Sequence, residues 1–223
     1  MSKAYTYLIA LSGVVCVAFV IRLFFFADLS ARTVRSDVIQ GVLVGVGLAL
    51  GTALVYGRLK GTRVNGWITM FGCGEPRNGM VFRAACAQTF LGPINSPQEA
   101  MYWWTNVDGA GRTLNGRRDY LLHFPPGGLP PNQAFWSLTM GDAKNHFVPN
   151  PISRYSVSDH SGLAQDPDGS VRIYIQNTAP AGRESNWLPA PASNFILWLR
   201  VYIPGKAILD GEYRMPAVDQ AKV

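Results

Sequence analysis

The front of the chain carries two long apolar runs that contain no charge. Residues 4–21 read AYTYLIALSGVVCVAFVI, and after Arg22 the run resumes with LFFFA. Residues 38–57 read VIQGVLVGVGLALGTALVYG. A helix needs about 20 apolar residues to cross the hydrocarbon layer of a bilayer. The pattern therefore predicts two transmembrane helices, at about 5–27 and 38–58, in a membrane anchor over residues 1–60.

Two alternatives to this anchor remain open. The first run can be read as a signal peptide, although it is long and no small-residue cleavage site of the A-x-A kind follows it. The chain can also hold one span and one helix in the interface. If the apolar runs are retained in the mature protein, we expect the lipid bilayer to be a partner of the chain.

From about Gly61 the pattern changes to short segments separated by Gly, Pro, Asn and Asp. Residues 61–91 are interpreted as a connecting segment, and turn signals then divide the rest. The candidate strands are YLLHF (120–124), AFWSLTM (134–140), SRYSV (153–157), VRIYIQ (171–176) and FILWLRVYI (195–203). Short aromatic and β-branched strands without alternating helices are typical of an antiparallel sandwich or jelly roll. We expect a mainly β domain over residues 92–223.

One short helix is expected at the start of this domain. Ser96 can act as N-cap, Pro97 suits the first helical position, and Glu99 completes an S-x-x-E capping box.

Five of the six net positive charges of the chain lie before Val64, in and next to the anchor. Seven of the 20 basic and two of the 14 acidic residues precede Val64, which leaves 13 basic and 12 acidic residues behind it. Basic residues that flank membrane spans meet anionic headgroups. A nucleic-acid partner would need a basic stripe on the domain, and the near-neutral balance argues against one.

Several segments resemble, in order, the family known as domain of unknown function 1214. They are NSPQEAMYW, LHFPPGGLPPNQAFWSLTMGD, NPISRYSVSD, DGSVRIYIQNTAP, NWLPAPASNFILWLRVYIP and LDGEYRMPAV, between about residues 92 and 218. The resemblance implies a jelly-roll-like sandwich and brings no established catalytic residues. Family members often carry a companion, domain of unknown function 1254, ahead of this domain, and no matching segment is expected here.

The resemblance also bears on orientation, because counts of Lys and Arg on the two sides of the spans do not decide it. Anchored family members have a Gly-rich segment that resembles GVLVGVGLALG and leads into an exported domain. On that basis the loop with Arg32 and Arg35 is cytoplasmic, and the sandwich lies in the periplasm of a bacterial inner membrane. Cys73 and Cys86 form a disulfide there or remain two small buried residues; the sequence leaves both open.

Four polar or aromatic residues are candidates for ligand binding: Arg154, Asp159, Asn186 and Trp187. An arginine beside Asp159 or Asp142 can hold an anion or a sugar by paired hydrogen bonds, and Trp187 beside Asn186 can stack on a sugar ring. In the alternative interpretation Arg154 braces loop carbonyls and Trp187 plugs the end of the core. Trp103, Trp104 and Trp136 are expected in the core.

No pattern predicts a metal site, a cofactor or a catalytic set. The histidines His123, His146 and His160 lack H-x-H or H-E-x-x-H spacing, and no G-x-S-x-G elbow, P-loop or dinucleotide fingerprint is present. We therefore expect a non-enzymatic protein. A hydrolase or binding module for cell-envelope glycan is the alternative.

The second apolar run contains two small-residue spacings, Gly41-x-x-x-Gly45 and Gly47-x-x-x-Gly51. Such spacings let transmembrane helices approach closely, although glycine is common in these helices in any case. The expected function is an accessory protein that assembles with itself or with a larger membrane complex.

Overall fold

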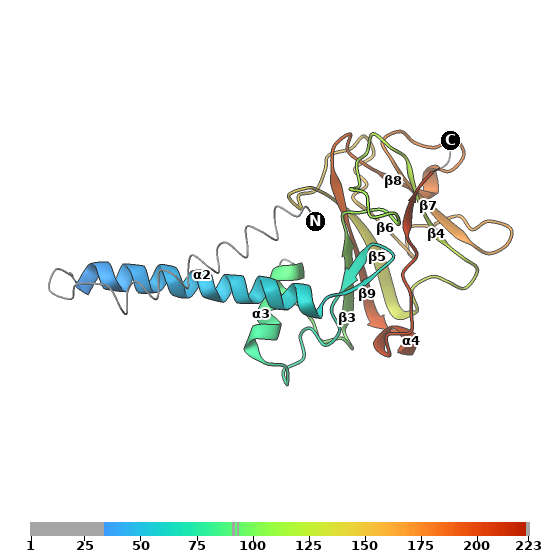
Figure 1. Cartoon of the computed structure of the whole chain (residues 1–223). Coiled ribbons are helices and arrows are strands. Elements are labelled where there is room, and N and C mark those ends of the chain that lie inside the picture. The colour runs from blue at the N-terminus through green and yellow to red at the C-terminus, as the bar shows by residue number, and fades with distance from the viewer. Residues whose placement is uncertain (1–33, 91, 93, 222–223) are drawn as a thin grey trace.

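The computed structural model describes residues 34–90, 92 and 94–221. The helix predicted at about 5–27 lies outside these residues. The described part begins with a long apolar helix that projects from a β-sandwich (Figure 1). The predicted mainly β architecture is confirmed.

The described helices are α2 (Val34–Lys60), α3 (Met80–Phe90) and α4 (Lys206–Leu209), with a 3-10 turn at Glu184–Asn186. The strands are β1 (Thr62–Val64), β2 (Trp67–Thr69), β3 (Ala100–Thr105), β4 (Tyr120–Phe124), β5 (Asn132–Asp142), β6 (Ser156–Ser158), β7 (Val171–Gln176), β8 (Trp187–Pro189), β9 (Phe195–Pro204) and β10 (Val218–Gln220). The candidate strands at 120–124 and 171–176 match β4 and β7 in full.

The strands form two sheets that face each other. One has the order β1-β2-β3-β9-β5-β6 and the other β10-β4-β7-β8. Their pairs are antiparallel except for β7 and β8, which run parallel. The sandwich is therefore antiparallel with one mixed sheet. β1 and β2 come from the predicted connecting segment, yet they extend the larger sheet.

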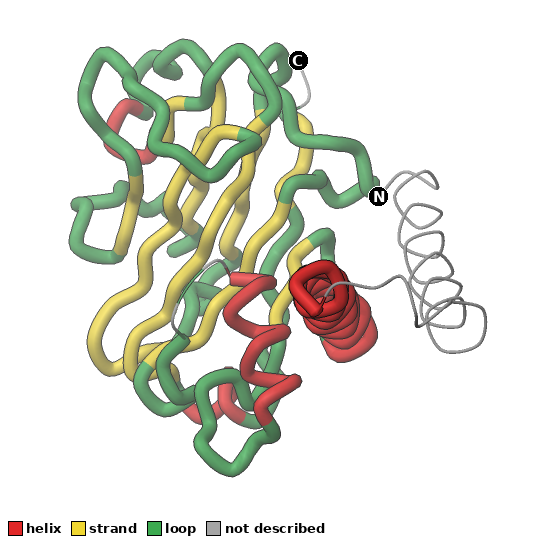
Figure 2. Tube along the Cα trace, turned by 90° about the vertical axis from the view of Figure 1, so that its left-hand side faces the viewer, coloured by secondary structure: helices red, strands yellow, loops and turns green. Residues whose placement is uncertain are grey.

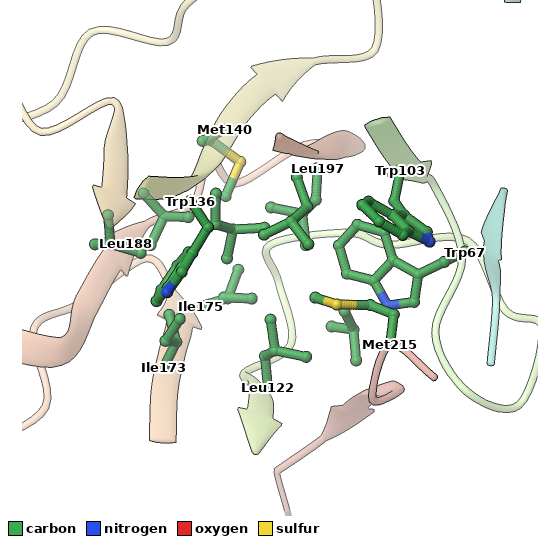
Figure 3. Packing of buried hydrophobic residues seen from close by; sticks show 14 of the residues in the cluster. Trp67, Trp103, Leu122, Trp136, Met140, Ile173, Ile175, Leu188, Leu197 and Met215 are labelled. Carbon is green, nitrogen blue, oxygen red and sulfur yellow. The ribbon is translucent and has the colours of Figure 1, made fainter. Parts of the chain in front are cut away.

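The core lies between the sheets and follows the two-residue period of their strands. In β7, Val171, Ile173 and Ile175 are buried while the intervening side chains are half-buried. Figure 3 shows Ile173 and Ile175 with Leu122 facing Leu197 and Trp136 from the other sheet.

A third layer covers part of the outer face of the six-stranded sheet. α3 packs there in a second apolar cluster with Phe90, Cys86 and Trp198. Because both faces of β9 are covered at this point, Leu197, Trp198 and Leu199 are all buried. This explains why FILWLRVYI reads as a nearly continuous apolar strand.

The short helix predicted after Ser96 is wrong in its position. The Glu99 carboxylate accepts from the backbone N–H of Ser96, as in a capping box, and from the Ser96 hydroxyl, but only a turn follows before β3 begins at Ala100. The apolar residues from Met101 to Trp103 alternate between the two faces of a central strand, and this pairing outweighs the local capping signal. The helices near the sandwich are instead α3 and α4.

Residues Ile39–Lys60 of α2 are long and apolar enough to cross a membrane. By length and composition this helix fits either a membrane anchor or a signal sequence. Most of the helix stands clear of the sandwich (Figure 1), and its C-terminal end packs against α3. Figure 2 shows α2 end on, next to α3.

Candidate functional site

Arg154 braces a loop. Its Nη1 donates to the carbonyl oxygens of Glu184 at 2.7 Å, Ser185 at 3.3 Å and Trp187 at 2.9 Å. One guanidinium thereby joins the segment before β6 to the 3-10 turn and the start of β8. This geometry favours the bracing interpretation of Arg154.

Asn186 and Trp187 turn inward. Asn186 is 1% exposed. Its Oδ1 accepts from the backbone N–H of Ala164, and its Nδ2 donates to the Ala164 carbonyl oxygen. The same amide donates to the carbonyl oxygen of Arg172. The indole N–H of Trp187 donates to the carbonyl oxygen of Gln176. Neither side chain offers an open stacking surface.

Asp159 lies on a different element from these three residues. Its carboxylate accepts from the backbone N–H of Trp136 at 3.3 Å and from Asn132 Nδ2 at 3.3 Å, at the first part of β5. Arg154 and Trp187 are brought together through a backbone carbonyl, whereas Asp159 does not join them. Ligand binding by the four residues stays a prediction, and the geometry does not favour it.

Two of the three histidines lie near single acids. His146 Nδ1 lies 3.5 Å from Asp142, and His160 Nε2 lies 3.9 Å from Asp159. Among the described residues, no group of three or more His, Cys, Asp and Glu side chains gathers to hold a metal ion.

The small-residue positions of α2 face open space. A β-carbon at Gly41, Gly45 or Gly51 would meet no atom of the described residues within 4 Å. Gly47 lies on the same exposed part of the helix. Their predicted packing partner is therefore not found in this part of the chain.

A pocket of about 850 Å³ opens where α2, α3 and the outer face of the larger sheet meet. We call it the junction pocket. Leu54 and Gly57 of α2, Gln88 of α3, and Trp104 and Trp198 of the sheet are among its walls. The volume falls in the range of small-molecule sites, about 300–1,000 Å³.

The junction pocket is positively charged. Arg58, Arg63 and Lys144 line it, and its described lining contains no acidic residue. Burial, and then the positive charge of Arg58, lower the pKa of Arg63 from its ordinary value. Two guanidinium groups near each other in a partly desolvated place favour an anion between them.

Two residues of this lining, Gln88 and Trp104, each carry a buried polar atom, Oε1 and Nε1 respectively, without a hydrogen-bond partner within the described part of the chain. Buried polar atoms are nearly always satisfied, so such atoms call for a bound group or water. The neighbouring Trp198 is different, because its Nε1 donates to Asn145 Oδ1 at 2.6 Å.

A disulfide between Cys73 and Cys86 fixes the wall that α3 provides. It joins the loop after β2 to the middle of α3. The sequence left this pairing open, and the structure contains it. A second pocket of about 700 Å³ lies on another flank of α2, where Lys60, Glu75 and Arg77 mix both signs of charge.

A family model described as "protein of unknown function (DUF1214)" matches residues 99–206. The β-sandwich belongs to the DUF1214 family. This confirms the resemblance seen in the sequence. No curated protein matches the chain.

Two solved structures are similar to the chain. The VPA0106 protein from Vibrio parahaemolyticus is 26% identical with a TM-score of 0.60, and the match covers 89% of this chain and 47% of that one. The chain thus spans about half the length of that relative. An uncharacterised protein from Burkholderia cenocepacia is 17% identical with a TM-score of 0.35, over 55% of this chain and 29% of that one; no conclusion rests on it.

Sequence reasoning missed the junction pocket. Arg58 and Arg63 were interpreted as flanks of a membrane span, and Trp104 was assigned to the core. Lys144 lies about 80 residues further along the chain, and only the pairing of β9 with β5 brings its loop to α2. No local motif links these positions.

Proposed function

We propose that this chain is a membrane-anchored accessory protein of a bacterial inner membrane. In this proposal α2 crosses the bilayer, and the DUF1214 sandwich lies at the periplasmic surface and assembles with itself or with a larger membrane complex.

The surface of α2 carries the proposal. Leu43 is 67% exposed and Val46 is 53% exposed, and they belong to an apolar surface that runs along the helix. An exposed apolar surface of this length is expected to be covered, either by another protein or by lipid. A bilayer satisfies it because the helix has the length that a span needs.

The docking of α2 supports an anchor over a cleaved signal sequence. Ala53 and Gly57 are buried near its C-terminal end, where Gly57 lies against Ala85 and Thr89 of α3. β1 then begins two residues after α2 ends. Removal of the helix would expose the face of α3 that it covers.

The Cys73–Cys86 disulfide supports the periplasmic orientation. Structural disulfides persist in oxidising compartments and are rare in the cytoplasm. The positions of Arg58, Lys60 and Arg63 favour the opposite orientation, because Lys and Arg near a span are usually on the cytoplasmic side. A role for Arg58 and Arg63 in the junction pocket offers another reason for their position.

Single-cysteine labelling tests this orientation. Asp219 is exposed near the end of the sandwich, and Cys16 is replaced by Ala so that Asp219→Cys supplies the only free thiol. We expect a membrane-impermeant maleimide to label intact spheroplasts. Labelling that requires permeabilised cells would place the sandwich in the cytoplasm.

The glycine spacings support assembly. Gly41 and Gly45 form one stripe on α2, and the stripe of Gly47 and Gly51 is rotated from it by about 120° at 100° per residue. Two small-residue stripes on different sides allow two close helix neighbours. The first apolar run of the chain and a second copy of α2 fit these two positions.

Extraction in a mild detergent tests the assembly. We expect the wild-type chain to elute as a species larger than the monomer, by light scattering. Gly45→Leu should shift it toward the monomer, while Val46→Leu, which enlarges an exposed position off the stripe, should not. A wild-type chain that is monomeric with no co-purifying protein would contradict the proposal.

A further inference from the structure

The junction pocket lies at the point where α2 leaves its exposed apolar stretch and enters the sandwich. Leu54 and Arg58 of its lining are in the last two turns of α2, and Arg63 follows in β1. If α2 spans the bilayer, this end of the helix is at the headgroup level. The pocket therefore opens at the depth where phospholipid headgroups lie.

The pocket combines charge for an anion with an apolar wall. Arg63 and Lys144 make no ion pair with the described residues. Ile68, Ile196 and Trp198 provide apolar surface beside them. An amphiphilic anion matches this lining better than an inorganic ion, which would leave the apolar wall without a partner.

The two unsatisfied atoms restrict the headgroup further. Nε1 of Trp104 is a donor and needs an acceptor such as a phosphate or ester oxygen. Oε1 of Gln88 is an acceptor and needs a donor such as a hydroxyl group. A phosphate that carries a polyol, as in a glycerol headgroup, supplies both.

We propose that the junction pocket binds an anionic phospholipid with a hydroxyl-bearing headgroup, taken from the leaflet next to the sandwich. The inference rests on the proposed role of α2 as a membrane span. The phosphate lies between Arg63 and Lys144, the headgroup hydroxyls face Gln88, and the acyl chains follow the apolar surface of α2 into the bilayer.

Native mass spectrometry of the full chain in detergent tests the pocket. The protein is titrated with an equimolar mixture of phosphatidylglycerol and phosphatidylcholine, and sn-glycerol 3-phosphate is added in a separate arm. We expect adducts of phosphatidylglycerol to dominate. Arg63→Gln with Lys144→Gln should reduce this preference by about fivefold for each charge removed.

Arg117→Gln with Arg118→Gln is the matched control, because both arginines are exposed and outside the pocket lining. This variant loses the same charge and should keep the preference. Trp104→Phe removes only the N–H donor and should weaken phosphatidylglycerol binding by about two- to tenfold.

Three outcomes would overturn the inference. One is no preference for phosphatidylglycerol in a chain that stays inserted in membranes, which leaves the anchoring role of α2 intact. Another is an equal loss in the two double variants, which would reduce the effect to general charge. The third is equally tight binding of sn-glycerol 3-phosphate, which would make the ligand a free phosphate ester rather than a lipid.

Discussion

Gly57 of α2 lies directly against Thr89 of α3. A β-carbon placed on Gly57 would stand 2.8 Å from the Thr89 hydroxyl and 3.6 Å from the carbonyl oxygen of Ala85. The same hydroxyl already donates to the Ala85 carbonyl at 2.7 Å. The absence of a side chain at Gly57 is thus what allows α2 to join the sandwich as a docked helix.

A larger side chain at Gly57 should separate α2 from α3. We expect Gly57→Leu to lower the free energy of unfolding by about 1–3 kcal/mol, the usual cost of overpacking. Thermal unfolding of the full chain in detergent, followed by circular dichroism, measures the change. Val46→Leu is the control, because it enlarges an exposed position of α2 away from α3 and off the glycine stripes; an equal loss in both variants would contradict the docking.

The disulfide should stabilise the wall of the junction pocket. Cys73 and Cys86 are separated by 13 positions, and closing a loop of this length stabilises a fold by about 3 kcal/mol in the chain-entropy model. Cys73→Ala with Cys86→Ala should lower the free energy of unfolding, measured by urea denaturation, by that amount. A reducing agent should destabilise the wild type but not the double variant, and a wild type that does not respond to reduction would show that the bond does not form.

Asn186 should matter for folding. Its buried amide satisfies three backbone groups of Ala164 and Arg172 through partly buried hydrogen bonds. Asn186→Ala leaves these groups without partners, and we expect a loss of roughly 3 kcal/mol. Asn194→Ala removes an exposed hydrogen bond that the side chain of Asn194 accepts from the side chain of Asn115, and this change should cost far less. Equal unfolding midpoints for Asn186→Ala and the wild type would reopen the possibility of a ligand role.

Asp142 should make stability depend on pH in the acid range. The backbone N–H of His146, which donates to its carboxylate, is the largest cause that lowers the pKa of Asp142. A depressed pKa in the folded state stabilises the protein above the ordinary value of about 3.9, and this stabilisation is lost as the pH falls through the folded value.

Asp142→Asn keeps an oxygen that can accept the same bond but does not titrate. As the pH falls below about 4, the unfolding temperature of the wild type should therefore decrease more steeply than that of Asp142→Asn. Parallel curves between pH 6 and pH 2 would show that this carboxylate does not contribute.

The strands could be predicted where their pattern is set by burial on one face. β7 alternates strictly between buried and half-buried positions, and the sequence predicted its bounds. β1 and β2 were missed because each has only three residues, too few for a period to appear. They form a hairpin around Asn65 and Gly66, both with positive φ, and Asn-Gly between short strands is the local signal that could have identified it.

The candidate site, unlike these strands, could not be predicted from the sequence. Arg154 and Asn186 were chosen for their chemistry, but their partners are backbone groups, which a sequence pattern does not reveal. The junction pocket depends on contacts between α2, α3 and a loop after β5. Such a site arises from the packing of distant elements, so single-sequence periodicity has no means to predict it.

The lipid contact of α2 is the central claim, and a spin label tests it directly. A nitroxide is attached at Leu43→Cys in the Cys16→Ala background, and a second variant carries it at Leu209→Cys in α4, within the sandwich. In reconstituted vesicles, oxygen concentrates in the bilayer and a nickel chelate stays in water. We predict that the label at position 43 is relaxed mainly by oxygen and the label at position 209 mainly by nickel. Preferential relaxation by nickel at position 43 would contradict a membrane-spanning α2.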